Sequence, residues 1–179
     1  MRRLPHKNLA AELLQKLLRG EIESRARTNV VLERKFADRL LAIVNRYRNR
    51  AIESAQVISE LIEMAKEFRE ASGRGERLGL KPEELAFYDA LVDNEEVVRQ
   101  MKDEVLQKIA LELTDKLRTS TTVDWGKRES VRARLRNLVR ITLRRHGYPP
   151  EGQDAAIELV MRQAERLSDS WSGRSGTDA

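Results

Sequence analysis

Few side chains in this 179-residue sequence have the type and spacing that catalysis requires. There is no cysteine, which excludes thiolate nucleophiles, disulfide frameworks and cysteine-ligated zinc. His6 and His146 are far apart and have no second metal ligand at helical spacing. Glu33-Arg34-Lys35 has the Glu-x-Lys spacing of a metal-dependent nuclease, but it lies in a helical pattern and no aspartate precedes it. We therefore predict that neither the two histidines nor Glu33-Arg34-Lys35 are catalytic.

The glycines and acidic residues do not form a cofactor site either. Gly73, Gly75 and Gly79 lack the lysine-hydroxyl pair and the preceding strand of a phosphate-binding loop. The acids of residues 93–104 would spread around helical surfaces, which favours a solvated face over a metal site. By itself, this chain is predicted to hold no cofactor or metal and not to be an enzyme.

Arginine is the chemically notable residue, because 25 of the 34 basic side chains are Arg. Residues 25–50 carry eight basic and two acidic residues, and residues 127–146 carry eight and one, whereas residues 83–115 carry three and ten. Within the second basic block, four arginines recur at i, i+4 spacing on one face of a predicted helix. The candidate contacts to a partner or to DNA phosphates are Arg132, Arg136, Arg140, Arg144, Arg46, Arg48 and Arg50.

Three interpretations of this arginine stripe stay open. It is a solvated face, or one paired with the acidic block; it binds nucleic-acid phosphates; or it is a protein-docking surface, where arginine is enriched and lysine is not. The excess of arginine over lysine favours the second and third interpretations without separating them.

The elements that position these residues are predicted to be helices. Aromatic residues are 4% of the chain, and it has 9 Gly and 4 Pro, too few for a barrel or sandwich of many short strands. We predict an all-α fold, an irregular bundle of about six to seven amphipathic helices with no sheet of consequence. No apolar run approaches the roughly 18 residues of a spanning helix, and no secretory signal is evident, so we expect a cytoplasmic protein with no membrane partner.

Apolar periodicity and end signals place the helices. Gly20 is predicted to stop the first, a turn is expected near Asn49, and Asp93 is predicted to cap a helix running to about Arg118. Trp125 is expected to anchor the start of the next helix, and Gly147 to end it. The predicted organisation is an N-terminal helical segment (1–72), a Gly-rich linker (73–80), a C-terminal helical domain (81–171) and a disordered tail (172–179). The predicted helices span residues 8–19, 28–47, 52–68, 82–91, 94–118, 125–146 and 150–167.

Several strings carry a family resemblance. They are Leu85-Ala86-Phe87-Tyr88-Asp89-Ala90-Leu91, Val123-Asp124-Trp125, Arg128-Glu129-Ser130-Val131-Arg132-Ala133 and Gly147-Tyr148-Pro149-Pro150, with Arg34-Lys35-Phe36 and Tyr47-x-Asn49-Arg50-Ala51-Ile52-Glu53 upstream. Together, over about residues 8–171, they resemble the C-terminal helical region of the restriction (R, motor) subunit of type I restriction-modification enzymes.

The resemblance implies a non-catalytic part of an ATP-dependent, site-specific deoxyribonuclease and DNA translocase. The nuclease and helicase domains, and with them ATP and Mg, are expected upstream of this region. The region would dock the motor on the methyltransferase and specificity subunits of the restriction complex. Two alternatives remain: a module of the same motor that contacts the backbone of double-stranded DNA, and a free-standing helical interaction or regulatory protein.

Overall fold

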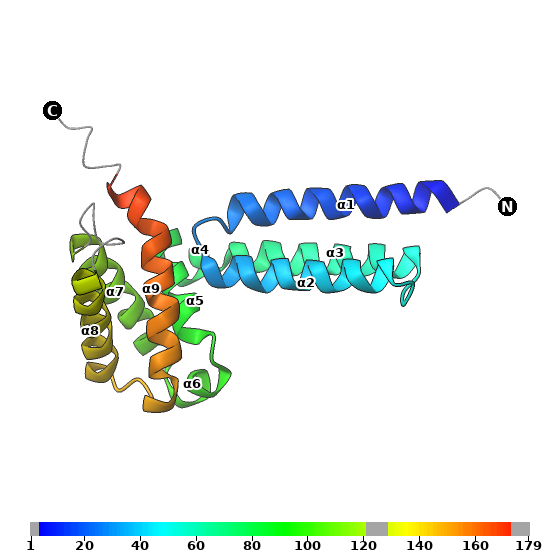
Figure 1. The fold of residues 1–179 in the computed structure, drawn as a ribbon. Helices are drawn as coiled ribbons and strands as arrows, with labels where there is room; N and C mark the ends of the chain where they lie inside the picture. Colours follow the sequence, from blue (N-terminus) through cyan, green and yellow to red (C-terminus); the bar gives the residue numbers. More distant parts are fainter. Residues whose placement is uncertain (1–3, 121–128, 173–179) are drawn as a thin grey trace. The chain divides into compact units, whose positions relative to one another are not determined.

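The computed structural model describes residues 4–120 and 129–172, with side chains described over 8–120 and 129–171 (Figure 1). Within these residues it contains nine helices and no strand, which confirms the predicted all-α fold. The chain divides into two compact units. The N-terminal unit is Met1–Arg27 with Leu32–Leu78, and the C-terminal unit is Thr28–Val31 with Gly79–Ala179.

Three long helices lie side by side in the N-terminal unit: α1 (Leu4–Arg25), α2 (Val30–Arg48) and α3 (Ser54–Ser72) (Figure 1). Their buried faces form one apolar core, in which the rings of Phe36 and Phe68 meet edge to face with centroids 5.0 Å apart. Such aromatic pairs add to the free energy already gained by burial. A short helix, α4 (Arg74–Leu78), follows α3.

Polar contacts tie the same three helices together at the rim of this core. The Arg39 guanidinium pairs with the Glu67 carboxylate across α2 and α3, and Nη2 donates to Oε1 at 3.0 Å. The partner carboxylate raises the pKa of Arg39, and the guanidinium lowers the pKa of Glu67. The Tyr47 hydroxyl donates to Oδ1 of Asn8 at 2.6 Å, which links α2 to α1.

The C-terminal unit is built around α5 (Pro82–Val92), whose residues 85–91 are all buried. It packs against α7 (Asp103–Ser120) and α9 (Pro150–Ser172), and α8 (Glu129–Arg145) contacts both of these. The short α6 (Glu95–Gln100) connects α5 to α7. A helix that is buried on every side lies at the centre of a bundle, and this explains why residues 85–91 are apolar on all faces except at Asp89.

A buried glutamine binds the short stretch Thr28–Val31, which leads into α2, within the C-terminal unit. Oε1 of Gln163 in α9 accepts from the Val30 N–H at 2.9 Å, and its Nε2 donates to the Thr28 carbonyl at 2.6 Å. Next to it, Nδ2 of Asn29 donates to the buried Asp89 at 2.7 Å. These bonds satisfy backbone groups that would otherwise lack partners, and they explain why Thr28–Val31 belongs to this unit.

Several predicted helix ends are confirmed. α5 begins at Pro82 and α9 at Pro150, and α2 ends just before the turn predicted near Asn49. Gly147 has φ +69°, and the Tyr148 N–H donates to the Leu143 carbonyl at 3.0 Å, which closes α8 with a Schellman-type cap. Burial, and to a smaller extent the charge of Asp93, raise the pKa of Tyr148 to about 12.

Other predicted helix ends are wrong. Gly20 does not stop α1, which continues to Arg25 because Ile22 is buried in the core. The helix predicted from Asp93 is two helices, α6 and α7, and its cap is Asn94, whose Oδ1 accepts from the Glu96 N–H at 3.0 Å. The predicted Gly-rich linker contains α4 rather than irregular backbone throughout. Ser172, predicted as the first residue of the tail, is the last residue of α9, whereas Trp125 and residues 173–179 lie outside the described residues.

We expect alanine at two glycines to have opposite effects on the free energy of unfolding. Gly20→Ala should stabilise by about 0.5–1 kcal/mol, because a Cβ there meets nothing within 4 Å in a helix interior. Gly152→Ala should destabilise by about 1–3 kcal/mol, because its Cβ would lie 2.6 Å from Cγ2 of the buried Val97. Urea denaturation measures both. A Gly152→Ala, Val97→Ala double variant should recover part of the loss, and two changes of the same sign would contradict this account.

We expect Gln163→Leu to lower the free energy of unfolding by about 1–3 kcal/mol, because the backbone groups of Thr28 and Val30 lose their partners. The control is the exposed neighbour Arg162→Ala, which should change it by about 0.5 kcal/mol or less. Equal effects of the two substitutions in urea denaturation would show that the amide bonds contribute nothing.

Candidate macromolecular interface

The four predicted arginines of α8 form a stripe that turns away from the core along the helix. Its buried face is Leu135, Val139, Thr142 and Leu143. An α-helix rotates by about 100° per residue, so each step of four residues moves a side chain about 40° around the axis. The stripe therefore begins beside the buried face at Arg132 and reaches solvent at Arg144, and these side chains are half-buried and exposed, respectively.

The first two arginines of the stripe pair with α9. Nη1 of Arg132 lies 3.8 Å from Oε1 of Glu165, and Nη2 of Arg136 donates to Oε1 of Glu158 at 2.7 Å. All four side chains are 41–54% exposed, so each pair contributes little to stability. Their effect is to neutralise this half of the stripe.

The second half of the stripe keeps its charge. Within the described part of the chain, Arg140 and Arg144 have no carboxylate partner. Between them lies Ile141, whose side chain is 50% exposed. We name Arg140, Ile141 and Arg144 the α8 outer patch. It combines two cations with an apolar side chain on one short stretch of helix.

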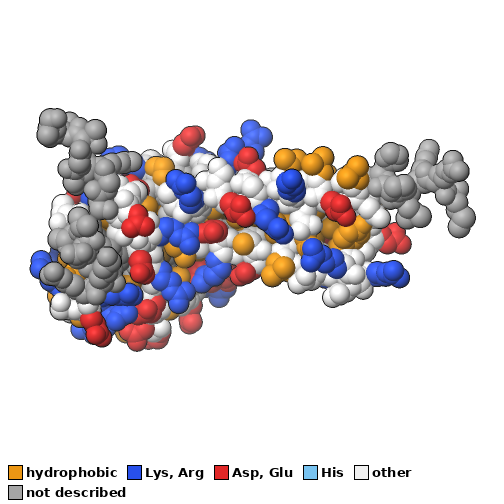
Figure 2. Space-filling view, turned by 45° about the horizontal axis from the view of Figure 1, so that its top comes forward, with side chains coloured by type: hydrophobic (Ala, Val, Ile, Leu, Met, Phe, Trp, Pro, Cys, Tyr) orange, Lys and Arg blue, Asp and Glu red, His pale blue; other side chains and the backbone are white. Residues whose placement is uncertain are grey.

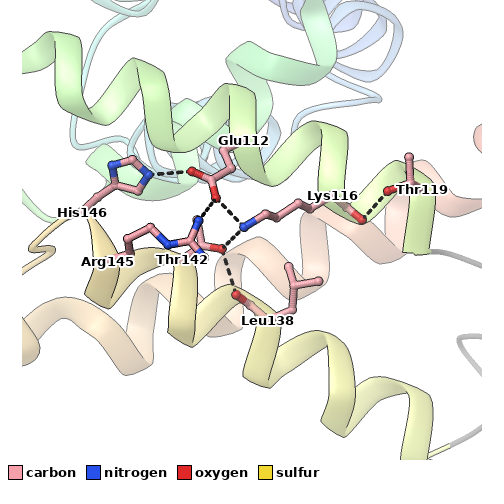
Figure 3. A network of polar contacts seen from close by, with 7 residues as sticks. All are labelled: Glu112, Lys116, Thr119, Leu138, Thr142, Arg145 and His146. Atoms are coloured by element: carbon pink, nitrogen blue, oxygen red, sulfur yellow. Dashed lines mark hydrogen bonds and ion pairs between the residues drawn. The ribbon is translucent and has the colours of Figure 1, made fainter.

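A carboxylate on α7 fixes the end of α8 that carries this patch (Figure 3). Oε1 of Glu112 accepts from Lys116 and, at 2.8 Å, from Nη1 of Arg145, while Oε2 lies 2.6 Å from Nε2 of His146. Lys116 also donates to Oγ1 of Thr142 at 3.3 Å. Hydrogen bonds from Lys116 and His146 lower the pKa of Glu112 to about 2. We name these residues the Glu112 network.

The remaining predicted arginines belong to the N-terminal unit. Arg46 pairs with Glu60 of α3. Arg48 lies at the end of α2 beside a groove of about 270 Å³ between α1 and α2. Arg50 occupies the following turn with φ +56°, a left-handed conformation that is uncommon for a residue other than glycine.

Sequence reasoning missed the Glu112 network and one exposed apolar face. Glu112 was counted only within the acidic block, and no local pattern pairs it with residues 33 and 34 positions away. On α1, three large apolar side chains, Leu9, Leu13 and Leu17, are exposed. Among the described residues, no group of three or more His, Cys, Asp or Glu could hold a metal ion.

Comparison with known proteins identifies the family. A family model described as "Type I restriction enzyme HindI endonuclease subunit-like, C-terminal" matches residues 1–170. The chain belongs to this family. It is 41% identical over 169 residues to the type I restriction enzyme HindI endonuclease subunit of Haemophilus influenzae, and 33% identical over 146 residues to a candidate type I restriction enzyme MjaIXP endonuclease subunit of Methanocaldococcus jannaschii.

These alignments relate the chain to one part of a restriction endonuclease subunit. They cover 94% and 81% of this chain but 16% and 14% of the HindI and MjaIXP subunits, respectively. No solved structure matches the chain. Over the described residues, no helix is long and apolar enough to cross a membrane.

We expect Glu112→Gln in this restriction-subunit region to lower the free energy of unfolding at pH 7 by about 1–3 kcal/mol. The reason is that Lys116, Arg145 and His146 would lose the negative charge of the carboxylate that they contact. The carboxyl pKa falls from 4.5 to about 2 on folding, so the contribution is complete above pH 4.5 and is lost as the pH falls toward 2. The difference from the unsubstituted chain should therefore shrink below pH 4.5.

Urea denaturation between pH 7 and pH 3 measures this difference. The control is Glu95→Gln, because Glu95 is 90% exposed and 3.8 Å from Arg99. A pH-independent loss in Glu112→Gln would show that packing, rather than charge, is what the glutamate supplies.

Proposed function

We propose that this chain is a non-catalytic docking module of a type I restriction enzyme endonuclease subunit, and that it holds the motor on the methyltransferase and specificity subunits. The observation that carries the proposal is the α8 outer patch. Arginine and exposed apolar side chains together are typical of the centre of a protein interface. Membership of the endonuclease-subunit family supplies the complex in which such an interface would be used.

The mixture of charge and apolar surface favours a protein partner over DNA. Affinity for the phosphate backbone of DNA comes from cationic side chains, because they release the counterions bound to the phosphates. The half-exposed Ile141 gains nothing from phosphates but is removed from water at a protein interface. The DNA alternative is supported by Arg140 and Arg144, which have no described carboxylate partner.

The Glu112 network supports a docking role because it holds the patch before binding. Arg145 and His146 follow the patch directly, and both contact Glu112. Binding by a helix that is already fixed avoids the entropy loss of ordering it. The patch therefore presents its side chains from a rigid support.

The test compares binding of this chain to the purified methyltransferase–specificity complex and to random-sequence duplex DNA. Arg140→Glu with Arg144→Glu should weaken binding to the complex by at least about tenfold, because two favourable charge contacts become repulsive. Ile141→Ser should weaken it several-fold. The unfolding midpoint should hardly change, because the described residues offer these arginines no ion pair.

The charge-matched control is Lys108→Glu with Arg162→Glu, two exposed positions on α7 and α9, and it should bind as the unsubstituted chain does. Suppose that the two arginine substitutions weaken only a salt-dependent binding to DNA, and that Ile141→Ser weakens binding neither to the complex nor to DNA. The DNA-contacting alternative then replaces the proposal. If the complex binds an intact endonuclease subunit but not this chain, the docking role is wrong.

A further inference from the structure

Helix α1 carries two apolar faces, of which only one packs in the N-terminal unit. Ala11, Leu18 and Ile22 are 2–5% exposed and contribute to the core. Leu9, Leu13 and Leu17 are 63%, 57% and 59% exposed. We name these three the leucine stripe.

The leucine stripe is contiguous. Residues four apart are neighbours on a helix, so its three side chains lie in one row of about 12 Å. Lys16, Gly20 and Ser24 lie seven residues after Leu9, Leu13 and Leu17, respectively. They share the same face of the helix, and all three are exposed. Figure 2 shows hydrophobic side chains gathered along the edge of this unit. A helix on the surface of a protein normally has one apolar stripe. A second apolar stripe therefore indicates that α1 packs between two structural elements.

The groove between α1 and α2 does not account for this face. It is lined by Ile22, Leu40 and Val44 among others, and none of the three exposed leucines contributes to it. The stripe lies on the side of α1 away from the core residues, where no described element of the N-terminal unit covers it.

Its size favours a tethered partner over a second copy of the chain. A stable interface between separate proteins buries about 800 Å² on each side, more than three half-exposed leucines provide. A segment joined to the same polypeptide needs far less contact area, because its effective concentration is already in the millimolar range.

The relatives indicate what such a segment is. The family description places the matched region at the C-terminal end of the subunit, and it makes up 16% of the HindI subunit. In that protein the larger part of the subunit therefore precedes the region that matches α1. We propose that the leucine stripe is the face on which the preceding part of the endonuclease subunit packs. This rests on the proposed function only in taking the chain as part of such a subunit.

The first experiment asks whether the stripe is unused in the isolated chain. Leu13→Asp with Leu17→Asp should lower the midpoint of thermal unfolding by no more than about 4 °C, which is the helix-propensity cost of two aspartates. The contrast is Leu18→Asp, a core position 5% exposed, which should lower it by about 10 °C or more. A large loss in the double variant would mean that the stripe packs within the chain, and would overturn the inference. So would a dimer of the isolated chain that the double variant dissociates, measured by light scattering.

The second experiment places the chain on a whole subunit. This chain replaces the matched region of the HindI endonuclease subunit, and a photo-reactive benzoylphenylalanine replaces Leu13. Mass spectrometry should find cross-links to the HindI part at several times the yield from the same probe at Glu63 of α3, which is 61% exposed. Leu13→Asp with Leu17→Asp should lower the thermal midpoint of this chimera by clearly more than it lowers that of the isolated chain.

Cross-link yields equal to the Glu63 control, or a midpoint shift in the chimera no larger than in the isolated chain, would overturn the inference. Binding of the chimera to the methyltransferase–specificity complex is measured separately. Retained binding without cross-links refutes this inference and leaves the proposed function standing. Cross-links without binding refute the docking role and leave the leucine stripe as an interface within the subunit.

Discussion

The rotation of about 100° per residue in an α-helix decides which side chains of this protein meet a neighbour. On α8 it carries an i, i+4 row of arginines from the carboxylates of α9 into solvent, so that two are paired, whereas Arg140 and Arg144 find no carboxylate among the described residues. On α1 it puts Leu18 in the core and leaves Leu13 and Leu17 outside. One geometric constraint therefore produces both exposed surfaces.

The parts of the fold that sequence predicted are those set by local chemistry. Pro82 and Pro150 begin helices because a proline in the first turn loses no hydrogen bond, and Gly147 ends one because its φ is positive. The orientation of α1 was not accessible in this way. Its leucines cover much of the circumference, and periodicity alone does not tell which of them faces α3.

The errors arise where a small local penalty meets larger tertiary contacts. Glycine within a helix costs about 1 kcal/mol, less than the gain from burying Ile22 and Ala26 beyond Gly20. Polar pairing at long range is equally hidden from sequence. Gln163 binds backbone groups 133 and 135 residues away, and nothing near it in the sequence indicates that its amide would be buried.

The same distinction explains why the arginine stripe was only partly understood from its sequence. The charge counts indicated an acidic block and a basic block that could pair as a whole, but charges are neutralised through individual contacts. Glu112 engages the end of α8, and Glu158 and Glu165 of α9 engage its beginning. The α8 outer patch remains, and its mixture of charge and apolar surface is typical of a reversible interface. The leucine stripe of α1 is uncharged, which is typical of a permanent interface. The two surfaces thus differ in chemistry in the way that assembly within a subunit differs from assembly between subunits.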